Sequence, residues 1–277
     1  MRSPRIAWRF RTTLIYLWLT ISVIAVCFPL YYVFEGALTP TIWLQKGLPG
    51  LLPLHLSFEN LLHATDLIPL GVQFVNSVLI TCTQTLGQIV IAIISAYALV
   101  FCQIRGARII FLIFLSTMMI PGETVLIANY LTITSWHLIN TLPAIFLPFL
   151  ASAFCIFLFR QAFLSFPQGL REAAILDGSG HFTFIRTMLL PLTRPTLISA
   201  TLISAIAAWN GFFWPLLVTN TPNSRTVQIG IAQLSSAEAA DVGVILAGTA
   251  MVTLPVLIVV LVGQRFLAGG LTTGALK

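Results

Sequence analysis

Six long apolar runs follow one another along this chain, and short polar segments separate them. Each run can form the ~20-residue apolar helix that is needed to cross a bilayer. The runs are continuous, whereas the strands of a membrane barrel would alternate apolar and polar positions. The pattern therefore predicts an all-α integral membrane protein with six transmembrane helices. The predicted spans are Thr12–Phe34, Gly71–Phe101, Ile109–Leu131, Leu142–Phe163, Thr196–Thr219 and Val242–Val262.

The composition agrees with a membrane protein. Of the 277 residues, 58% are hydrophobic and only 8% are charged, whereas a soluble domain carries about 25% charged residues. So few charges cannot cover a water-facing surface, which excludes a soluble globular domain. The first run follows several arginines, as in a signal peptide. It is too long for one, and no A-x-A site follows Phe34, so we expect it to be retained as the first helix.

The positions of Lys and Arg predict the orientation in the membrane, because cytoplasmic loops carry an excess of these residues. If the N-terminus is cytoplasmic, all of them except Lys46 and Arg225 lie on the cytoplasmic side. The net charge of +6 reflects this bias and gives no reason to expect nucleic-acid binding. We expect residues 1–11 and 265–277 in the cytoplasm, with one six-span domain over residues 12–264 between them.

The loops between the predicted spans differ in length. The outer segment Glu35–Leu70 contains several Pro and Gly residues, so we expect irregular structure with one short helix there. Asn220–Asp241 is predicted to be a second outer loop. On the cytoplasmic side, the short segment Gln103–Gly106 should join the second and third spans in a tight hairpin.

The most polar long segment, residues 166–195, lies between the fourth and fifth spans on the predicted cytoplasmic side. Pro167 suits the start of a helix, the alanines that follow favour helix, and Gly178 suits a left-handed cap at its end. A second short helix is predicted over His181–Leu190. Its apolar stripe is predicted to consist of Phe182, Ile185 and Leu189. By composition alone, this segment is either an ordinary amphipathic loop or a docking surface for a partner.

The spacing within this segment resembles the signature of the permease subunits of importer-type ABC transporters. It reads E-A-A, three residues, G, nine residues and then aliphatic-x-L-P, with Asp177 before the glycine and Met188 where Ile is usual. That swap conserves apolar volume. The resemblance implies that the segment is a coupling helix held in a cleft of a separate ATPase, where Glu172 makes polar contacts and Gly178 supplies the turn. The implied ATPase-coupling residues are Glu172, Ala173, Ala174, Asp177, Gly178, Leu190 and Pro191.

Other segments are similar to the second permease of carbohydrate-type importers, a group that includes maltose and glycerol-3-phosphate systems. They are Phe74–Ser77, Asn140–Thr141, Leu147–Pro148, Phe159–Gln161, Trp209–Asn210 and Trp214–Leu216. The resemblance implies the type I importer permease fold in the bacterial cytoplasmic membrane. It also implies four partners besides membrane lipid: two copies of a P-loop ATPase that bind ATP and Mg²⁺, a homologous second permease, and an extracytoplasmic solute-binding protein.

The chain itself carries no motif for catalysis or nucleotide binding. Its lysines, Lys46 and Lys277, do not follow a glycine-rich turn, so the sequence contains no P-loop. The histidines are far apart, and the four cysteines form no C-x-x-C pair, which favours surface and packing roles. We expect a non-catalytic subunit without a cofactor or metal of its own. The solute stays open among a neutral disaccharide, an amino sugar, glycerol-3-phosphate and a glycerophosphodiester.

Polar residues inside the spans are candidates for a solute path, because such groups are costly in lipid. Glu123 is the only acidic residue within a predicted span, and it follows Pro121-Gly122, where we expect the helix to break. It either lines the path, with Asn129 and Tyr130 continuing the same face, or has a structural role. In the structural alternative, it is a buried carboxylate paired with a neighbouring helix, or it lies near the outer interface.

A second candidate cluster consists of Trp209, Asn210 and Trp214 in the fifth span. Trp faces stack on sugar rings, and an Asn amide both donates and accepts hydrogen bonds. The alternative is aromatic packing with one interhelical hydrogen bond. Asn76 in the second span, like its neighbours Gln84 and Gln88, is either a path residue or an interhelical hydrogen-bonder. The paired permease could also hold most of the solute contacts.

The rival function is a self-sufficient secondary transporter. It would require ion-coupling residues near the middle of the membrane and often an inverted repeat. A single carboxylate, Glu123, gives it little support. An ATP-driven importer permease is the function that the resemblance favours.

Overall fold

The computed structural model describes residues 4–45, 55–236 and 241–272, and every regular element within these ranges is a helix. The predicted all-α fold is therefore confirmed. The chain divides into two compact units. The first unit comprises residues 1–68 and 231–253, and the second comprises residues 69–230 and 254–277.

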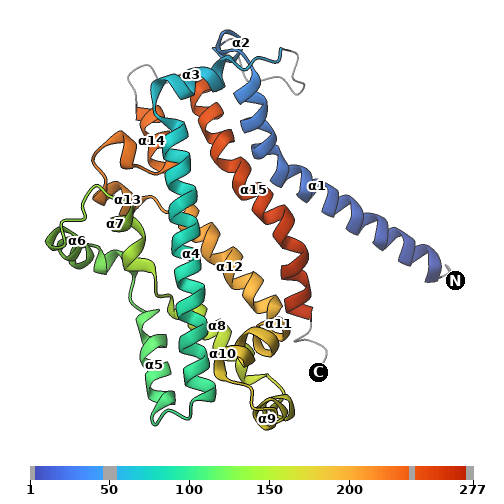
Figure 1. Ribbon diagram of the computed structural model, residues 1–277. Helices are drawn as coiled ribbons and strands as arrows, with labels where there is room; N and C mark the ends of the chain where they lie inside the picture. Colours follow the sequence, from blue (N-terminus) through green and yellow to red (C-terminus); the bar gives the residue numbers. More distant parts are fainter. Residues whose placement is uncertain (1–3, 46–54, 237–240, 273–277) are drawn as a thin grey trace. The chain divides into compact units, whose positions relative to one another are not determined.

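The first unit contains the N-terminal helix α1 (Pro4–Leu38), two short helices and the beginning of α15 (Val242–Thr272) (Figure 1). The last turns of α1 pack against α3 and α15 through a small apolar cluster. Its members are Val33, Phe34, Ala37, Leu61, Ala247 and Ala250. Along most of its length, α1 instead exposes large apolar side chains, which suits a helix that faces lipid or another subunit.

The described residues of the segment Glu35–Leu70, which was predicted to be an outer loop with one short helix, include two, so the prediction of one was wrong. They are α2 (Thr41–Gln45) and α3 (Glu59–Leu67). Hydrogen bonds within the unit hold these helices. The side-chain amide of Asn60 donates to the carbonyl of Thr39 at 2.8 Å. The Thr41 hydroxyl donates to the Asp241 carboxylate at 2.7 Å. Both contacts join residues far apart in the sequence, which a local reading of Pro and Gly content does not detect.

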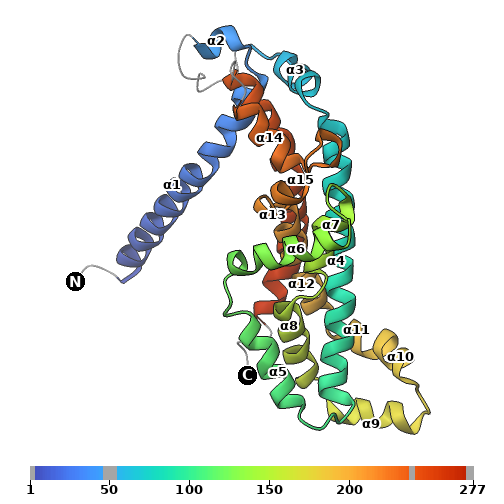
Figure 2. The ribbon, with the colours of Figure 1, turned by 90° about the vertical axis from the view of Figure 1, so that its left-hand side faces the viewer.

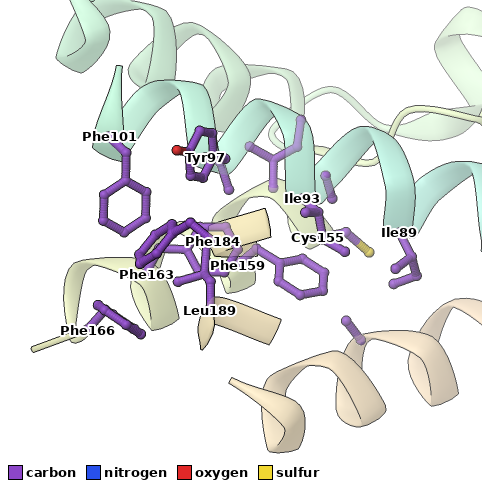
Figure 3. Packing of buried hydrophobic residues seen from close by; sticks show 14 of the residues in the cluster. Ile89, Ile93, Tyr97, Phe101, Cys155, Phe159, Phe163, Phe166, Phe184 and Leu189 are labelled. Atoms are coloured by element: carbon purple, nitrogen blue, oxygen red, sulfur yellow. The ribbon is translucent and has the colours of Figure 1, made fainter. Parts of the chain in front are cut away.

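The second unit is built around α4 (Leu70–Phe101), which packs along α8 (Ala153–Leu164) and α12 (Arg194–Trp209) (Figure 1). Figure 3 shows the apolar side chains that fill the contact between these helices. Phe159 and Phe163 are 0% and 1% exposed. Small residues at the same contact let the helix backbones approach closely, as in other membrane helix bundles. They are Ala92, Ala96 and Ala200.

The predicted number of spans fits the structure, but only half of the spans are continuous. Arg11–Leu38 of α1, all of α4 and Val242–Gln264 of α15 are each long and apolar enough to cross a membrane. Three bent pairs bring the number of candidate spans to six when each pair counts as one. They are Ala107–Thr117 with Gly122–Ser135 (92°), Leu142–Phe149 with Ala153–Leu164 (45°), and His181–Leu192 with Arg194–Trp209 (84°).

The third predicted span breaks where the sequence indicated. Helix α5 (Ala107–Thr117) ends before Pro121, and the short helix η1 (Gly122–Val125) leads into α6 (Leu126–Ser135). Proline lacks the N–H that would continue the helix, so it ends the hydrogen-bond ladder at this point. The break expected at Pro121-Gly122 is confirmed.

The fourth predicted span is interrupted as well, which the sequence analysis did not foresee. Helix α7 (Leu142–Phe146) and the turn η2 (Leu147–Phe149) precede α8, which starts after Ser152. The Ser152 side chain caps α8 by accepting a hydrogen bond from the Cys155 N–H at 3.3 Å.

The fifth predicted span, Thr196–Thr219, contains another break that the sequence analysis missed. Helix α12 ends at Trp209, and α13 (Phe213–Val218) begins after an interruption at residues 210–212. Asn210 is the C-cap of α12. Its backbone N–H makes the last helical bond, to the Ile206 carbonyl at 3.1 Å, and its side-chain amide donates to the same carbonyl at 2.9 Å.

The segment Asn220–Asp241, predicted to be a loop, contains the short helix η4 (Pro222–Ser224) and the helix α14 (Val227–Ser236). The beginning of α14 is buried, with Val227 and Ile229 0% and 1% exposed. The Val227 N–H donates to the Ser77 hydroxyl of α4 at 2.9 Å. Tertiary packing therefore orders a stretch that has the turn residues of a loop.

The Phe159→Ala substitution should destabilise the second unit. It leaves a cavity where a side chain with no exposed surface now packs, and such changes cost about 3–5 kcal/mol. We expect the melting temperature of the detergent-solubilised protein to fall by several degrees. The control is Ile94→Ala on α4, whose side chain is 60% exposed and should cost little. Equal losses in the two variants would contradict this packing.

Candidate functional site

The polar segment 166–195 lies at the end of α4 that carries the short loop 102–106 (Figure 2). It consists of helix α9 (Gln168–Leu176), a sharp turn, and a second helical stretch made of α10 (His181–Phe184), η3 (Ile185–Leu189) and α11 (Leu190–Leu192). The two predicted short helices around a turn are confirmed. The predicted tight hairpin connects α4 to α5, and Gly106 is the last residue before α5 begins.

The turn after α9 depends on Gly178, whose φ is +70°. The Gly178 N–H donates to the Ile175 carbonyl at 3.0 Å, and the Ser179 N–H donates to the Ala174 carbonyl at 2.9 Å. This pair of bonds is the Schellman motif, which satisfies the last carbonyls of a helix and reverses the chain. The predicted left-handed cap at Gly178 is confirmed, and Asp177 occupies the C-cap position.

The apolar stripe predicted for the second helical stretch was wrong at its first position. Phe182 is 74% exposed, whereas Phe184 is 5% and Leu189 is 0% exposed. The cause is the π-helical turn at Ile185–Leu189. A π turn takes one more residue than an α turn, so it rotates the positions before it relative to those after it.

Arg171 joins this segment to α4. Its guanidinium donates to the Phe101 carbonyl at 3.0 Å, and its Cζ lies 5.1 Å from the centre of the Phe101 ring. Phe101 is the last residue of α4, so its carbonyl has no partner within the helix and lies at the negative end of the helix dipole. The positively charged guanidinium of Arg171 donates a hydrogen bond to this carbonyl and is also favoured by the negative end of the dipole. The sequence analysis did not identify Arg171, because the contact joins residues 70 positions apart.

A second contact joins Tyr97 of α4 to His181, the first residue of α10. The Tyr97 hydroxyl and the His181 Nδ1 are 2.6 Å apart. Near this contact, the ring of Phe184 packs edge-on against the rings of Phe101 and Phe166, with ring centres 5.7 and 5.5 Å apart. His181 is exposed, which agrees with the surface or interface role expected of the histidines, and Tyr97 is its partner on α4. The segment is therefore fixed to α4 by two polar contacts and an aromatic cluster.

The opposite face of the segment is exposed. Of the residues implied by the resemblance, Glu172, Ala173, Asp177 and Gly178 are exposed. Ala174 is 2% exposed and belongs to the core, Leu190 is half-buried, and Pro191 is exposed. Three large apolar side chains next to the turn are also exposed: Ile175 by 62%, Leu176 by 87% and Phe182 by 74%. Neighbouring exposed apolar groups of this kind mark protein interaction sites.

The first group of path candidates lies at the break between α5 and α6. Glu123 is exposed, within η1, and its carboxylate makes no ion pair or hydrogen bond with the described residues. Asn129 is half-buried and Tyr130 is exposed, both on α6. The structure gives Glu123 no buried partner within the part of the chain it describes, so a path position and a place near the outer interface both stay open.

The second group of candidates is largely engaged in packing. The Trp214 Nε1 donates to the Ala144 carbonyl at 3.0 Å, and Trp209 packs edge-on against Phe74 at 5.5 Å between ring centres. Asn76 donates to the carbonyls of residues 223 and 225, at 2.8 and 3.1 Å. These contacts fit the structural alternatives, whereas Asn210 is exposed at the end of α12.

Two surface pockets of the second unit lie beside the end of α12. One pocket, of about 190 Å³, is lined by Trp209, by Cys82 of α4 and by α15 at Pro255. Its lining is almost entirely apolar. A second pocket, of about 300 Å³, brings Trp214 together with Gln84 and Gln88 of α4. From the sequence, both glutamines were either path residues or interhelical hydrogen-bonders, and the Gln88 Nε2 donates to the Phe149 carbonyl at 2.7 Å. Among the described residues, no group of His, Cys, Asp and Glu could hold a metal ion.

Comparisons with known proteins place this arrangement in context. The family model described as "Binding-protein-dependent transport system inner membrane component" matches residues 1–269. The sn-glycerol-3-phosphate transport system permease protein UgpE of Brucella suis biovar 1 is 33% identical over 264 residues, which cover 91% of this chain and 93% of that protein. The protein of the same name from Yersinia pestis is 30% identical with the same coverage.

A solved structure is similar over nearly the whole chain. It is a chain from the crystal structure of a bacterial ABC transporter involved in the import of the acidic polysaccharide alginate. The TM-score is 0.81 and the identity is 25%, and the match covers 96% of this chain and 98% of that one. The likeness extends to both units of the fold.

The Arg171→Met substitution should loosen α9 from α4. It removes a charge-assisted hydrogen bond at a half-exposed site, worth about 1 kcal/mol. We expect about fivefold faster amide hydrogen exchange over residues 168–176, measured by mass spectrometry. Arg186→Met changes an exposed arginine of the same segment and serves as the control. Equal exchange in the two variants would show that Arg171 does not hold the helix.

Proposed function

The chain belongs to the binding-protein-dependent transport system inner membrane component family, and on that basis we propose that its segment 166–195 couples a separate ATPase to the membrane helices. The chain is a multi-pass permease component of an ABC importer in the inner membrane. A self-sufficient secondary transporter is not favoured by these relationships. The family points to a transport subunit and away from an enzyme.

The observation that carries the proposal is the two-sided construction of the segment. One side, through Arg171 and His181, is bonded to α4. The other side exposes Ile175, Leu176 and Phe182 next to the Gly178 turn. A docking surface that is rigidly joined to a membrane helix is what transmission of force requires. Glu172 and Asp177, both exposed beside these apolar groups, are available for polar contacts with the ATPase.

In the proposed mechanism, two copies of the ATPase bind ATP and Mg²⁺ and close. The segment 166–195 moves with them as one body, because Ala174 of α9 and Phe184 of α10 belong to the same buried apolar cluster. Arg171 and His181 transmit this motion to α4, and the Pro191–Pro195 region transmits it to α12. A homologous second permease forms the other wall of the path. An extracytoplasmic binding protein delivers the solute, with both termini of this chain in the cytoplasm.

We assign the solute to the sugars and glycerol-phosphate-like compounds. The relatives with about 30% identity are named for sn-glycerol-3-phosphate. A phosphate group would be bound best by basic side chains, yet the only basic residue within the six predicted spans is Arg160. Its Cζ lies 4.0 Å from the centre of the Phe111 ring, in a packing contact. Charge for a phosphate would therefore come from the second permease or the binding protein.

The Gly178→Val substitution tests the proposal. A β-branched residue at φ +70° costs on the order of 1–3 kcal/mol, so the turn should rearrange and the docking surface should be lost. No other atom lies within 4 Å of the missing Cβ, so the effect comes from the backbone alone. We expect the assembled complex to lose solute-stimulated ATPase activity while the subunit stays in the membrane.

The matched control is Gly180→Val in the same turn. Gly180 has a φ of −69° and equally open surroundings, so it accepts a side chain without strain and coupled activity should persist. Normal coupling in the Gly178 variant would disprove the proposal. Loss of coupling in both variants would also contradict it, since the backbone of Gly178 would then not be the cause.

The Glu123→Gln substitution tests the path at the break between α5 and η1. The change removes a charge and keeps the shape of an exposed side chain. If the carboxylate faces the path, the KM for solute uptake by reconstituted transporter should change severalfold. Thr124→Val, the adjacent exposed residue whose hydroxyl bonds only to the Pro121 carbonyl, should behave as wild type. Unchanged uptake kinetics across solutes would assign Glu123 a structural role.

A further inference from the structure

The pocket of about 300 Å³ in the second unit has features of a binding site that packing alone does not explain. It lies between α4, the turn η2 and the break between α12 and α13. Its volume is at the lower end of ligand pockets, which span about 300–1,000 Å³. Residues that shape it include Gln84, Gln88, Phe149, Gly211, Phe212 and Trp214.

The broken backbone on one side of this pocket needs polar surroundings. Residues 210–212 separate α12 from α13 within the fifth predicted span. Irregular backbone at membrane depth is tolerated only where protein buries it or where it lines a water-filled cavity. Asn210 is exposed and Gly211 is half-buried in this chain. The break therefore borders either water or another subunit, and lipid cannot occupy this position.

Two amides from α4 face the same pocket one helical turn apart. The Gln88 Nε2 donates to the Phe149 carbonyl at 2.7 Å, which fixes this side chain and leaves its Oε1 as an acceptor. The side-chain amide of Gln84 makes no hydrogen bond within the described part of the chain, and the residue is half-buried. An amide without a partner at membrane depth costs free energy. A bound hydroxyl group or water would supply the missing partner.

The chemistry of the lining indicates what the pocket binds. The amides donate and accept hydrogen bonds, and the rings of Phe149 and Phe212 offer apolar surface. The residues that line the pocket, all of them within the described ranges, include no ionisable side chain. A few oriented polar groups on an aromatic wall are typical of small-molecule sites. This combination suits the hydroxyls and C–H faces of a polyol, and it offers no positive charge to an anion.

We propose that this pocket is a solute-binding site of this subunit and that it receives an uncharged polyhydroxylated group, such as a sugar ring or a glycerol moiety. The proposal rests on the permease function above and adds to it the solute chemistry of one site. If the solute is a phosphate ester, its glycerol part occupies this pocket and its phosphate lies outside it. The unpaired amide of Gln84 is the main specificity-determining group.

The first experiment asks whether the pocket opens to water in the whole transport complex. Gln84→Cys is treated with trimethylammonium-ethyl methanethiosulfonate, a charged, water-soluble thiol reagent, and labelling of the unsubstituted complex is subtracted. The control is Leu86→Cys, which is 66% exposed on the other side of α4 and should stay unlabelled in lipid. We expect labelling of Gln84→Cys at a rate that changes when ATP is added. An unreactive Gln84→Cys would overturn the proposal, since the pocket would then be filled by a partner subunit.

The second experiment measures uptake by proteoliposomes that contain the same complex, with radiolabelled sn-glycerol-3-phosphate and maltose as probes. For whichever probe is transported, Gln84→Leu should raise the KM about five- to tenfold, as expected for one lost hydrogen bond in a polar site. Thr83→Val is the control, because the Thr83 hydroxyl bonds only within α4 and lies outside the pocket. A KM unchanged by Gln84→Leu would overturn the proposal. That result would not contradict the proposed coupling function, provided that Gly178→Val still uncouples the complex.

Discussion

The backbone of a membrane protein must satisfy its hydrogen bonds inside the protein, and this constraint organises the structure. Where a span is a continuous helix, as in α4, all its backbone groups are satisfied and its sides are free to meet lipid or another helix. Where a span breaks, as it does at residues 118–121, 150–152 and 210–212, the chain needs water or protein nearby. The breaks are therefore the places where a path for a polar solute is possible, and both groups of path candidates lie beside them.

The same rule explains the end of α4 that contacts the segment 166–195. The last carbonyls of a helix have no partner in the helix, and Arg171 supplies one to Phe101. At the end of α9, the backbone N–H groups of Gly178 and Ser179 donate to the last carbonyls through the Schellman motif. Satisfying these helix ends thus joins the segment 166–195 to α4. The contact leaves Leu176 and Phe182 exposed, as the proposed docking surface requires.

Features with a local cause could be predicted from the sequence. Apolar runs predicted the spans, Pro121 predicted a break, and Gly178 predicted a left-handed turn, because each acts through its own backbone or its near neighbours. Features that depend on distant residues could not be predicted. Val227 at the start of α14 is fully buried, and the Tyr97–His181 contact joins residues 84 positions apart. The π turn at Ile185–Leu189 has no signal in its own residues. The coupling roles of residues 172–178 stay predictions, supported by their exposure and by the family.

The most direct test of the account is a photo-crosslink from Leu176 in the intact transporter. A photoreactive amino acid at this position, 87% exposed beside the Gly178 turn, should give an adduct with the ATPase subunit whose yield changes with ATP. The same group at Ile94, exposed along the middle of α4, should give none. A complex that transports solute yet forms no ATPase adduct from Leu176 would contradict the claim that residues 166–195 receive the motion of the ATPase.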